Sequence, residues 1–142
     1  MRNLKLMLII FATSLFSSNS NAQNKMTQTE NAKQFVSKFT EFKMDIQGAG
    51  MATIPSATIS KDNSLLIDYA YNSEGEKRKG SMKLDFVEKS KRFEGHWETK
   101  ADNGNVYNGT LYFVFKEIGE AEGYYKYAGS DYKITIFVPT KK

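Results

Sequence analysis

The chain of 142 residues is 40% hydrophobic and 13% aromatic, carries a formal net charge of +4, and contains one histidine and no cysteine. Its length suits one domain with one hydrophobic core. The lack of cysteine excludes disulfides, thiol catalysis, thiolate zinc sites and iron–sulfur clusters, and a single histidine excludes a multi-histidine metal site within one chain.

The first 22 residues have the pattern of a signal peptide. Arg2 and Lys5 precede an apolar run over 6–16, and Ser20 and Ala22 stand where a signal peptidase accepts small residues, which predicts cleavage after Ala22. We therefore expect an exported protein, periplasmic or secreted. The apolar run is too short for a stable membrane span. Loss of Arg2 and Lys5 lowers the net charge to about +2, which gives little reason to expect binding to nucleic acid.

Residues 23–29 are polar and are predicted to form a disordered linker, so a single domain is expected over 30–142. Its first element is a predicted amphipathic helix over about 30–44, with an apolar face formed by Ala32, Phe35, Val36, Phe39 and Phe42. We expect this helix to close one side or one end of the core of a sheet. The alternative is a helix that binds a membrane surface or a partner.

Seven segments after this helix alternate between apolar and polar residues, which is typical of strands with one buried face. Pro55 within the first segment indicates an edge, a bulge or a bend. The sequence Asp102-Asn103-Gly104 is the strongest hairpin signal in the chain, because asparagine and glycine tolerate the positive φ of tight hairpin turns. The strands are predicted at about 51–60, 65–72, 81–86, 92–98, 106–115, 123–127 and 132–138.

Four glycines recur at intervals of 14 or 15 residues near the starts of successive strands, at Gly80, Gly95, Gly109 and Gly123. Each is predicted to lie on the inner face, where a missing side chain lets a strand coil and leaves room for a neighbouring ring. The pattern predicts a mainly β fold, an up-and-down antiparallel meander of about seven strands curled into a small barrel or half-barrel, with one N-terminal amphipathic helix. A flatter sheet with the helix across its concave face is the alternative.

The segment Gly95-His96-Trp97 resembles the Gly-x-Trp signature of lipocalins and similar strands of avidins, and the meander resembles their architecture. This resemblance implies a small antiparallel β-barrel whose mouth can hold a small apolar molecule.

Six aromatic residues are predicted to face the interior as candidate ligand-binding residues: Trp97, Tyr69, Tyr71, Tyr107, Tyr125 and Tyr127. Rings with polar tips on one face can line a cavity that has apolar walls and a few polar groups. They can equally pack as a solid core, so the sequence leaves a hollow and a filled interior open. A cavity of about 300 Å³ or more favours the ligand.

The outer face also carries apolar residues, and these are candidates for contact with a protein partner: Tyr112, Val114, Tyr124 and Phe137. An exposed apolar patch on a soluble protein usually binds something. The alternative is that the helix covers this face.

His96 alternates with Glu94 and Glu98 on one strand, so the three side chains share a face. A histidine beside carboxylates can ligate a metal or act as a general base. Because Trp97 points the other way, into the interior, we expect these three residues to form a solvated charged face. No catalytic residue, metal or cofactor is predicted.

The sequence therefore favours a non-enzymatic, exported binding protein that holds a small apolar or amphipathic ligand in a barrel interior lined by Trp and Tyr. The alternative is a protein-binding module, of the inhibitor or immunity type, that acts outside the cytoplasm through an exposed sheet face. A hydrolase is a distant third hypothesis.

Overall fold

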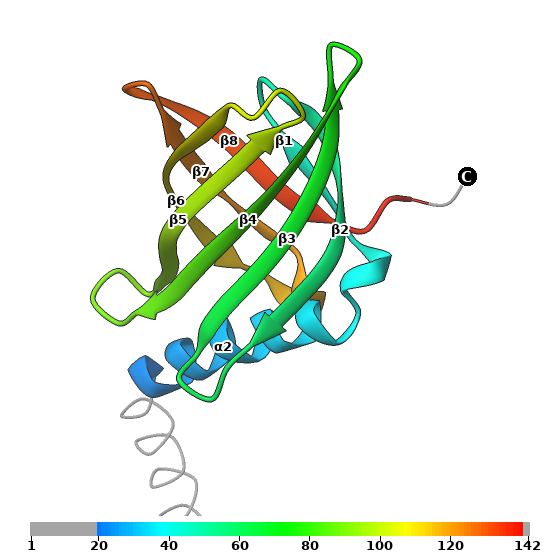
Figure 1. Ribbon diagram of the computed structural model, residues 1–142. Coiled ribbons are helices and arrows are strands. Elements are labelled where there is room, and N and C mark those ends of the chain that lie inside the picture. The colour runs from blue at the N-terminus through cyan, green and yellow to red at the C-terminus, as the bar shows by residue number, and fades with distance from the viewer. Residues whose placement is uncertain (1–19, 141–142) are drawn as a thin grey trace, which may run out of the picture.

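The computed structural model describes residues 20–140, which form a closed antiparallel barrel with one helix across an end (Figure 1). Each strand pairs with the next, and β1 pairs with β8 to close the sheet. The predicted mainly β, up-and-down meander with an N-terminal helix is confirmed. The elements are α2 (Ser20–Ser37), η1 (Phe39–Glu41), β1 (Lys43–Ile46), β2 (Gly50–Ile59), β3 (Ser64–Ser73), β4 (Glu76–Val87), β5 (Arg92–Ala101), β6 (Val106–Phe115), η2 (Glu117–Gly119), β7 (Ala121–Tyr127) and β8 (Ser130–Phe137).

The barrel has eight strands, one more than the seven that the sequence predicts. The additional strand is β1, whose first two residues were assigned to the helix over 30–44. Met44 and Ile46 are buried and alternate with exposed Lys43 and Asp45, which is the period of a strand. This short segment pairs with both β2 and β8, so it removes the two edges that a seven-stranded sheet would leave open.

The predicted helix and linker boundaries are wrong. Helical backbone runs over Ser20–Ser37, so it includes the 23–29 segment that was expected to be disordered, and it ends before 38–44. No glycine or proline occurs between 20 and 37, so nothing in the local sequence breaks the helix. The predicted signal peptide falls mostly on residues 1–19, outside the described residues, while the predicted cleavage site after Ala22 falls within α2.

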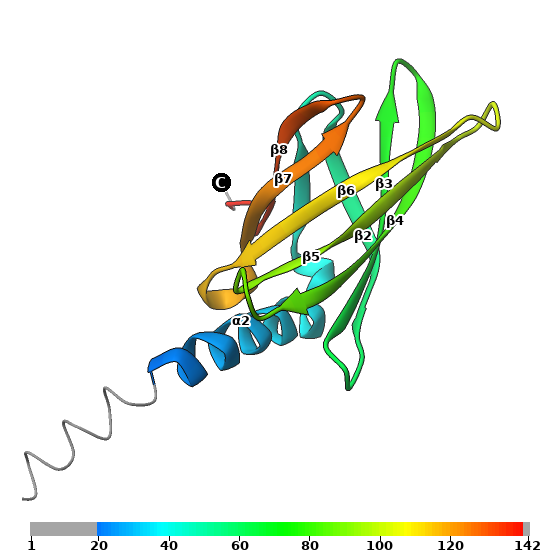
Figure 2. The same ribbon diagram turned by 90° about the vertical axis from the view of Figure 1, so that its left-hand side faces the viewer.

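One end of the barrel is closed by α2, as Figure 2 shows from the side. Phe35 is fully buried there, 5.3 Å from the Phe42 ring in an edge-to-face contact and 5.8 Å from the Phe115 ring. Gln28 fixes the helix to the end of β6: its Oε1 accepts a hydrogen bond from the Phe115 N–H at 2.9 Å, and its Nε2 donates to the Phe115 carbonyl at 2.7 Å. The helix therefore closes an end of the core, one of the two positions expected for it.

The interior next to α2 is filled by apolar side chains. Phe93 and Phe113 face each other across β5 and β6, and Met44 and Ile136 do so across β1 and β8. All four are fully buried, and each such side chain stabilises the fold by about 1.5–3 kcal/mol. The hydrophobic core therefore sits in the helix-proximal half of the barrel.

The four spaced glycines lie on inward positions of β4 to β7, as predicted. Their role is to permit close approach of neighbouring strands. A Cβ atom built on Gly95 would lie 1.8 Å from the Lys83 carbonyl oxygen, and one built on Gly123 would lie 1.8 Å from the Tyr112 carbonyl oxygen. No side chain fits there, so these positions allow the strong coiling that closes a small barrel.

Gly95→Ala should therefore destabilise the fold by about 1–3 kcal/mol, because backbone rather than a flexible side chain must move to admit the methyl group. Urea unfolding followed by circular dichroism measures the change. Ser81→Thr adds a methyl group on the exposed outer face of β4 and should change the free energy of unfolding by less than about 0.5 kcal/mol. Equal effects of the two substitutions would contradict this role of Gly95.

Phe35→Ala should lower the free energy of unfolding by about 3–5 kcal/mol, because it leaves a cavity between α2 and the barrel. Lys33→Ala, at an exposed position of the same helix, is the matched control and should have an effect below about 0.5 kcal/mol. Thermal unfolding of both variants measures the difference. A stable Phe35→Ala variant would show that the helix contributes little to the core.

Candidate functional site

The barrel contains a cavity of about 320 Å³ at the end opposite α2. It lies beneath the turn between β1 and β2 and extends inward to the apolar core. Its lining combines apolar residues, tyrosines, the sole tryptophan and one arginine: Ile46, Gly48, Ala49, Tyr69, Tyr71, Arg78, Met82, Trp97, Thr99, Tyr107, Tyr125, Tyr127 and Ile134.

All six residues predicted to face a ligand line this cavity. They come from four strands, with Tyr69 and Tyr71 on β3, Trp97 on β5, Tyr107 on β6, and the last two tyrosines on β7. Alternation along each strand points them inward, and the strand register brings them to one end. The sequence left open whether the interior is hollow or filled, and at this end the barrel is hollow.

Trp97 forms a rigid part of the cavity wall. Its side chain is 7% exposed, and its Nε1–H donates a hydrogen bond to the Lys126 carbonyl oxygen at 3.2 Å. The ring lies edge-on to Tyr125 at 5.7 Å and tilted to Tyr127 at 5.9 Å, between ring centroids. Tyr107 in turn contacts Tyr127 at 6.1 Å. These mutual contacts restrict the motion of the rings that form this part of the cavity wall.

The polar groups of two tyrosines are held by hydrogen bonds at the cavity boundary. The Tyr69 hydroxyl lies 2.5 Å from Thr99 Oγ1, and burial raises the pKa of Tyr69 well above its ordinary value. The Tyr125 hydroxyl donates to the Gln47 carbonyl oxygen at 2.5 Å, and burial raises the pKa of Tyr125 to about 12. Both tyrosines therefore stay neutral near pH 7, where they contribute hydrogen-bonding groups and no charge.

Arg78 is a lining residue that the sequence interpretation missed. The predicted strand covers only 81–86, whereas β4 begins at Glu76. Arg78 lies two residues before Gly80 and four before Met82, so all three share one face of the strand. Extending the inward–outward alternation of β4 toward its start would have placed Arg78 on the inner face. The same alternation, extended past the predicted end of β5, would have placed Thr99 on the inner face with Trp97.

The outer-face candidates come together only in part. Tyr112 and Tyr124 are directly opposite each other on β6 and β7, with ring centroids 6.1 Å apart, and Val114 lies beside them at a shallow depression of about 170 Å³. Phe137 lies on β8 opposite Lys43 and does not line this depression. The helix covers the barrel end and leaves Tyr124 45% exposed.

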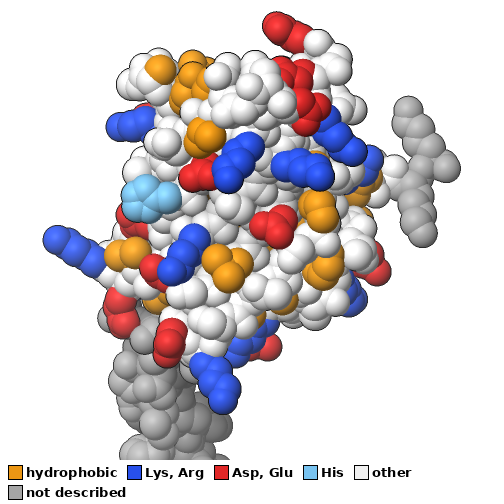
Figure 3. Space-filling model, viewed as in Figure 1, with side chains coloured by type: hydrophobic (Ala, Val, Ile, Leu, Met, Phe, Trp, Pro, Cys, Tyr) orange, Lys and Arg blue, Asp and Glu red, His pale blue; other side chains and the backbone are white. Residues whose placement is uncertain are grey.

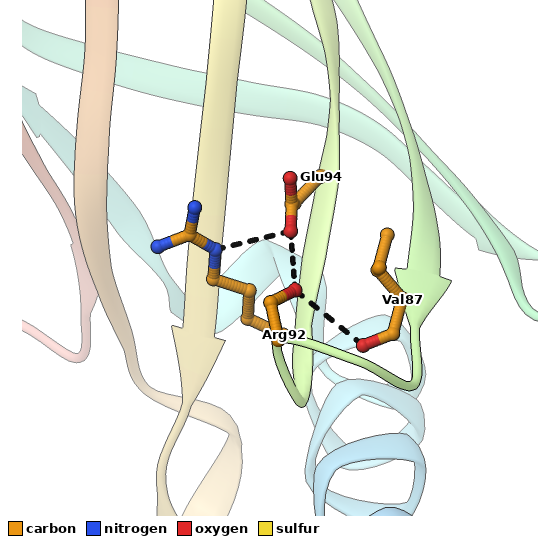
Figure 4. Close-up of polar contacts among 4 residues, drawn as sticks. Val87, Arg92 and Glu94 are labelled. Atoms are coloured by element: carbon orange, nitrogen blue, oxygen red, sulfur yellow. Dashed lines mark hydrogen bonds and ion pairs between the residues drawn. The ribbon is translucent and has the colours of Figure 1, made fainter.

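Charged side chains surround the Tyr112 ring. The Arg92 guanidinium lies 3.6 Å from its centroid. Figure 4 shows how this arginine is held: Arg92 Nε is 3.2 Å from Glu94 Oε2, which also accepts a hydrogen bond from the Ser90 hydroxyl, and Ser90 Oγ lies 3.5 Å from the Val87 carbonyl oxygen. These partners lower the pKa of Glu94, the Ser90 hydrogen bond being the largest cause. The ring is therefore partly shielded by an ordered cation.

On the face seen in Figure 3, basic and acidic side chains are interspersed and hydrophobic side chains occur in small separate groups. His96 is exposed on the outer face of β5, as expected, with Lys83 and Thr110 opposite it on the adjacent strands. Across the described residues, no group of three or more histidine, aspartate or glutamate side chains is arranged to hold a metal ion. Within 20–140, no helix has the length and apolar character needed to cross a membrane.

Comparisons with models of known families, with curated proteins and with solved structures each found no match. The eight-stranded antiparallel barrel is consistent with the lipocalin and avidin class of architecture.

The buried Tyr69 hydroxyl should make the fold less stable as pH rises above about 10. An unfolded chain loses the tyrosine proton near pH 10, whereas the folded chain retains it, so alkaline pH favours unfolding by up to about 1.4 kcal/mol per pH unit for one such group. Tyr69→Phe should flatten this dependence in urea unfolding measured from pH 8 to pH 11. Tyr124→Phe, on the outer face, should not. Parallel pH profiles for the wild type and Tyr69→Phe would contradict the assignment.

Proposed function

We propose that this is a non-enzymatic binding protein that holds a small apolar or amphipathic molecule in the barrel cavity. The observation that carries the proposal is a hollow of about 320 Å³ lined by the only tryptophan and five tyrosines. Its volume falls at the lower end of the range of small-molecule sites, about 300–1,000 Å³. Solid packing of these rings would have left no such space.

The chemistry of the lining supports binding rather than catalysis. Its described members include no carboxylate, imidazole or thiol, which are the groups that most often act as general base or nucleophile. The single histidine lies on the opposite face of β5, directed away from the cavity. The interior thus offers rings, aliphatic side chains and a few hydrogen-bonding groups, a composition suited to holding a ligand unchanged.

The proposal also includes export from the cytoplasm and a relationship to lipocalin-like binding proteins. The pattern of residues 1–22 supports export to the periplasm or the exterior, with cleavage after Ala22. The Gly95-His96-Trp97 segment on β5 and the eight-stranded barrel support a relationship to lipocalin-like binding proteins. In such a barrel, one end is closed by packing and the other admits the ligand.

A second candidate function is favoured by the pair of half-buried Tyr112 and exposed Tyr124, which suits a protein partner docking on β6 and β7 as an inhibitor or immunity-type module would. The shielding of Tyr112 by Arg92, and an ion pair of 3.1 Å between Lys116 and Glu122 nearby, make this surface less apolar than a typical interface core. We therefore rank it below the cavity.

The neutral fluorescent probe phenylnaphthylamine should bind the wild-type protein and accept excitation energy from Trp97, because the probe would sit against the sole tryptophan. Ala49→Phe places a ring at the cavity wall and should weaken this binding by about tenfold or more. Ala70→Phe adds the same ring on the outer face of β3 and should change the affinity by less than about twofold. Fluorescence titration measures both.

Melting curves of the two alanine variants check that each is folded. Equal probe affinity for both would place the probe outside the cavity. Loss of binding in a Tyr112→Ser/Tyr124→Ser double variant would place it on the outer face and favour the second candidate.

A further inference from the structure

Arg78 is the only charged residue among those lining the cavity. Its guanidinium lies 5.2 Å from the centre of the Tyr107 ring, and the side chain of Tyr71, directly opposite on β3, is the main reason that the pKa of Arg78 is raised. The arginine is thus permanently charged and is held at the mouth of the cavity by two tyrosines from different strands.

The Arg78 side chain has unused hydrogen-bonding capacity. Its Nε atom is buried and has no hydrogen-bond partner. Among the described residues, every other buried side-chain nitrogen or oxygen has a partner. An unpaired buried N–H of a cation is unfavourable, and proteins usually satisfy such a group or reserve it for a ligand. The Nε–H and a neighbouring Nη–H together form a fork that can donate hydrogen bonds to both oxygens of a carboxylate.

No acidic residue neutralises this charge within the cavity. Glu76 precedes Arg78 by two residues on β4 and is the carboxylate that acts on it. The Glu76 side chain instead accepts a hydrogen bond from the Asn103 backbone N–H at 3.2 Å, and no ion pair joins it to Arg78 among the described side chains. The cavity itself therefore carries one uncompensated positive charge.

We propose that the ligand is a small organic monoanion, whose acidic group pairs with Arg78 at the mouth and whose apolar body lies against Trp97 and Met82. This inference rests on the proposed binding function and specifies the ligand class. One guanidinium matches one carboxylate in charge and geometry, whereas a neutral lipid or a cation would leave Arg78 Nε unsatisfied. The aromatic and aliphatic walls deeper in the barrel select the apolar part.

The test compares two probes that share the anilinonaphthalene ring system. Phenylnaphthylamine is neutral, and anilinonaphthalene sulfonate carries one negative charge. Arg78→Gln should weaken binding of the sulfonate by about tenfold to hundredfold, as expected for loss of a charge-assisted hydrogen bond, and should change binding of phenylnaphthylamine by less than about twofold. Arg78→Lys should recover part of the lost affinity because it restores the charge without the fork.

Lys79→Gln is the matched control, because it removes the same charge from the adjacent residue on the exposed outer face. It should leave the affinity for both probes unchanged. The inference is overturned if Arg78→Gln weakens both probes equally, or if Lys79→Gln reproduces its effect on the sulfonate. Circular dichroism of each variant confirms the fold.

The two proposals fail in different ways. Binding of phenylnaphthylamine without any dependence of sulfonate binding on Arg78 leaves the cavity function intact and removes the monoanion. Failure of both probes to enter the wild-type cavity overturns both. A competition series then separates two forms of the acid: displacement of the sulfonate by octanoate but not octanol supports an aliphatic acid, and displacement by naphthoate but not naphthol supports an aromatic one.

Discussion

The limited width of an eight-stranded barrel is the constraint on which the rest of the structure depends. Closing eight strands fixes an interior just wide enough to be filled by side chains or to hold one small molecule. This chain does both, at opposite ends. Phenylalanines and aliphatic residues fill the helix-proximal half, where Phe93, Phe113 and Phe115 are almost completely buried, and tyrosines line the other half without filling it.

The two halves use different kinds of aromatic residue for a physical reason. A phenylalanine has no polar atom to satisfy, so it can be enclosed entirely, as Phe35 of α2 is between the helix and the barrel. A tyrosine needs a partner for its hydroxyl, and the rim of a barrel offers backbone carbonyls such as that of Gln47. The open end is therefore the natural place for tyrosines, and the packed core and the cavity occupy separate parts of one interior.

The inward faces of β3 to β8 could be read from the sequence because alternation over seven or more residues leaves one consistent register, and the spaced glycines marked where strands approach closely. Strand β1 could not, since its four residues continue directly from a helical pattern, and Ile46, four residues after Phe42, fits both periods. Arg78 was missed for another reason. A run of charged residues resembles a turn, unless one notices that Arg78 lies four residues before Met82 and therefore on the same face of the strand. The cavity itself depends on how side chains from seven strands and a turn fill the space between them, and no local pattern in the sequence records that volume.

Pairing of β1 with β8 joins residues that lie far apart in the chain, as in the Lys43–Phe137 pair. The remaining strand pairs are hairpin neighbours, so most of the barrel can assemble in the order of synthesis, whereas this last seam must wait for the final strand. Until then β1 and β8 present open edges, the state most prone to intermolecular strand addition. The seam pairs only four residues of each strand, Lys43–Ile46 with Ile134–Phe137, so the edge that β1 leaves open while the chain is incomplete is only four residues long.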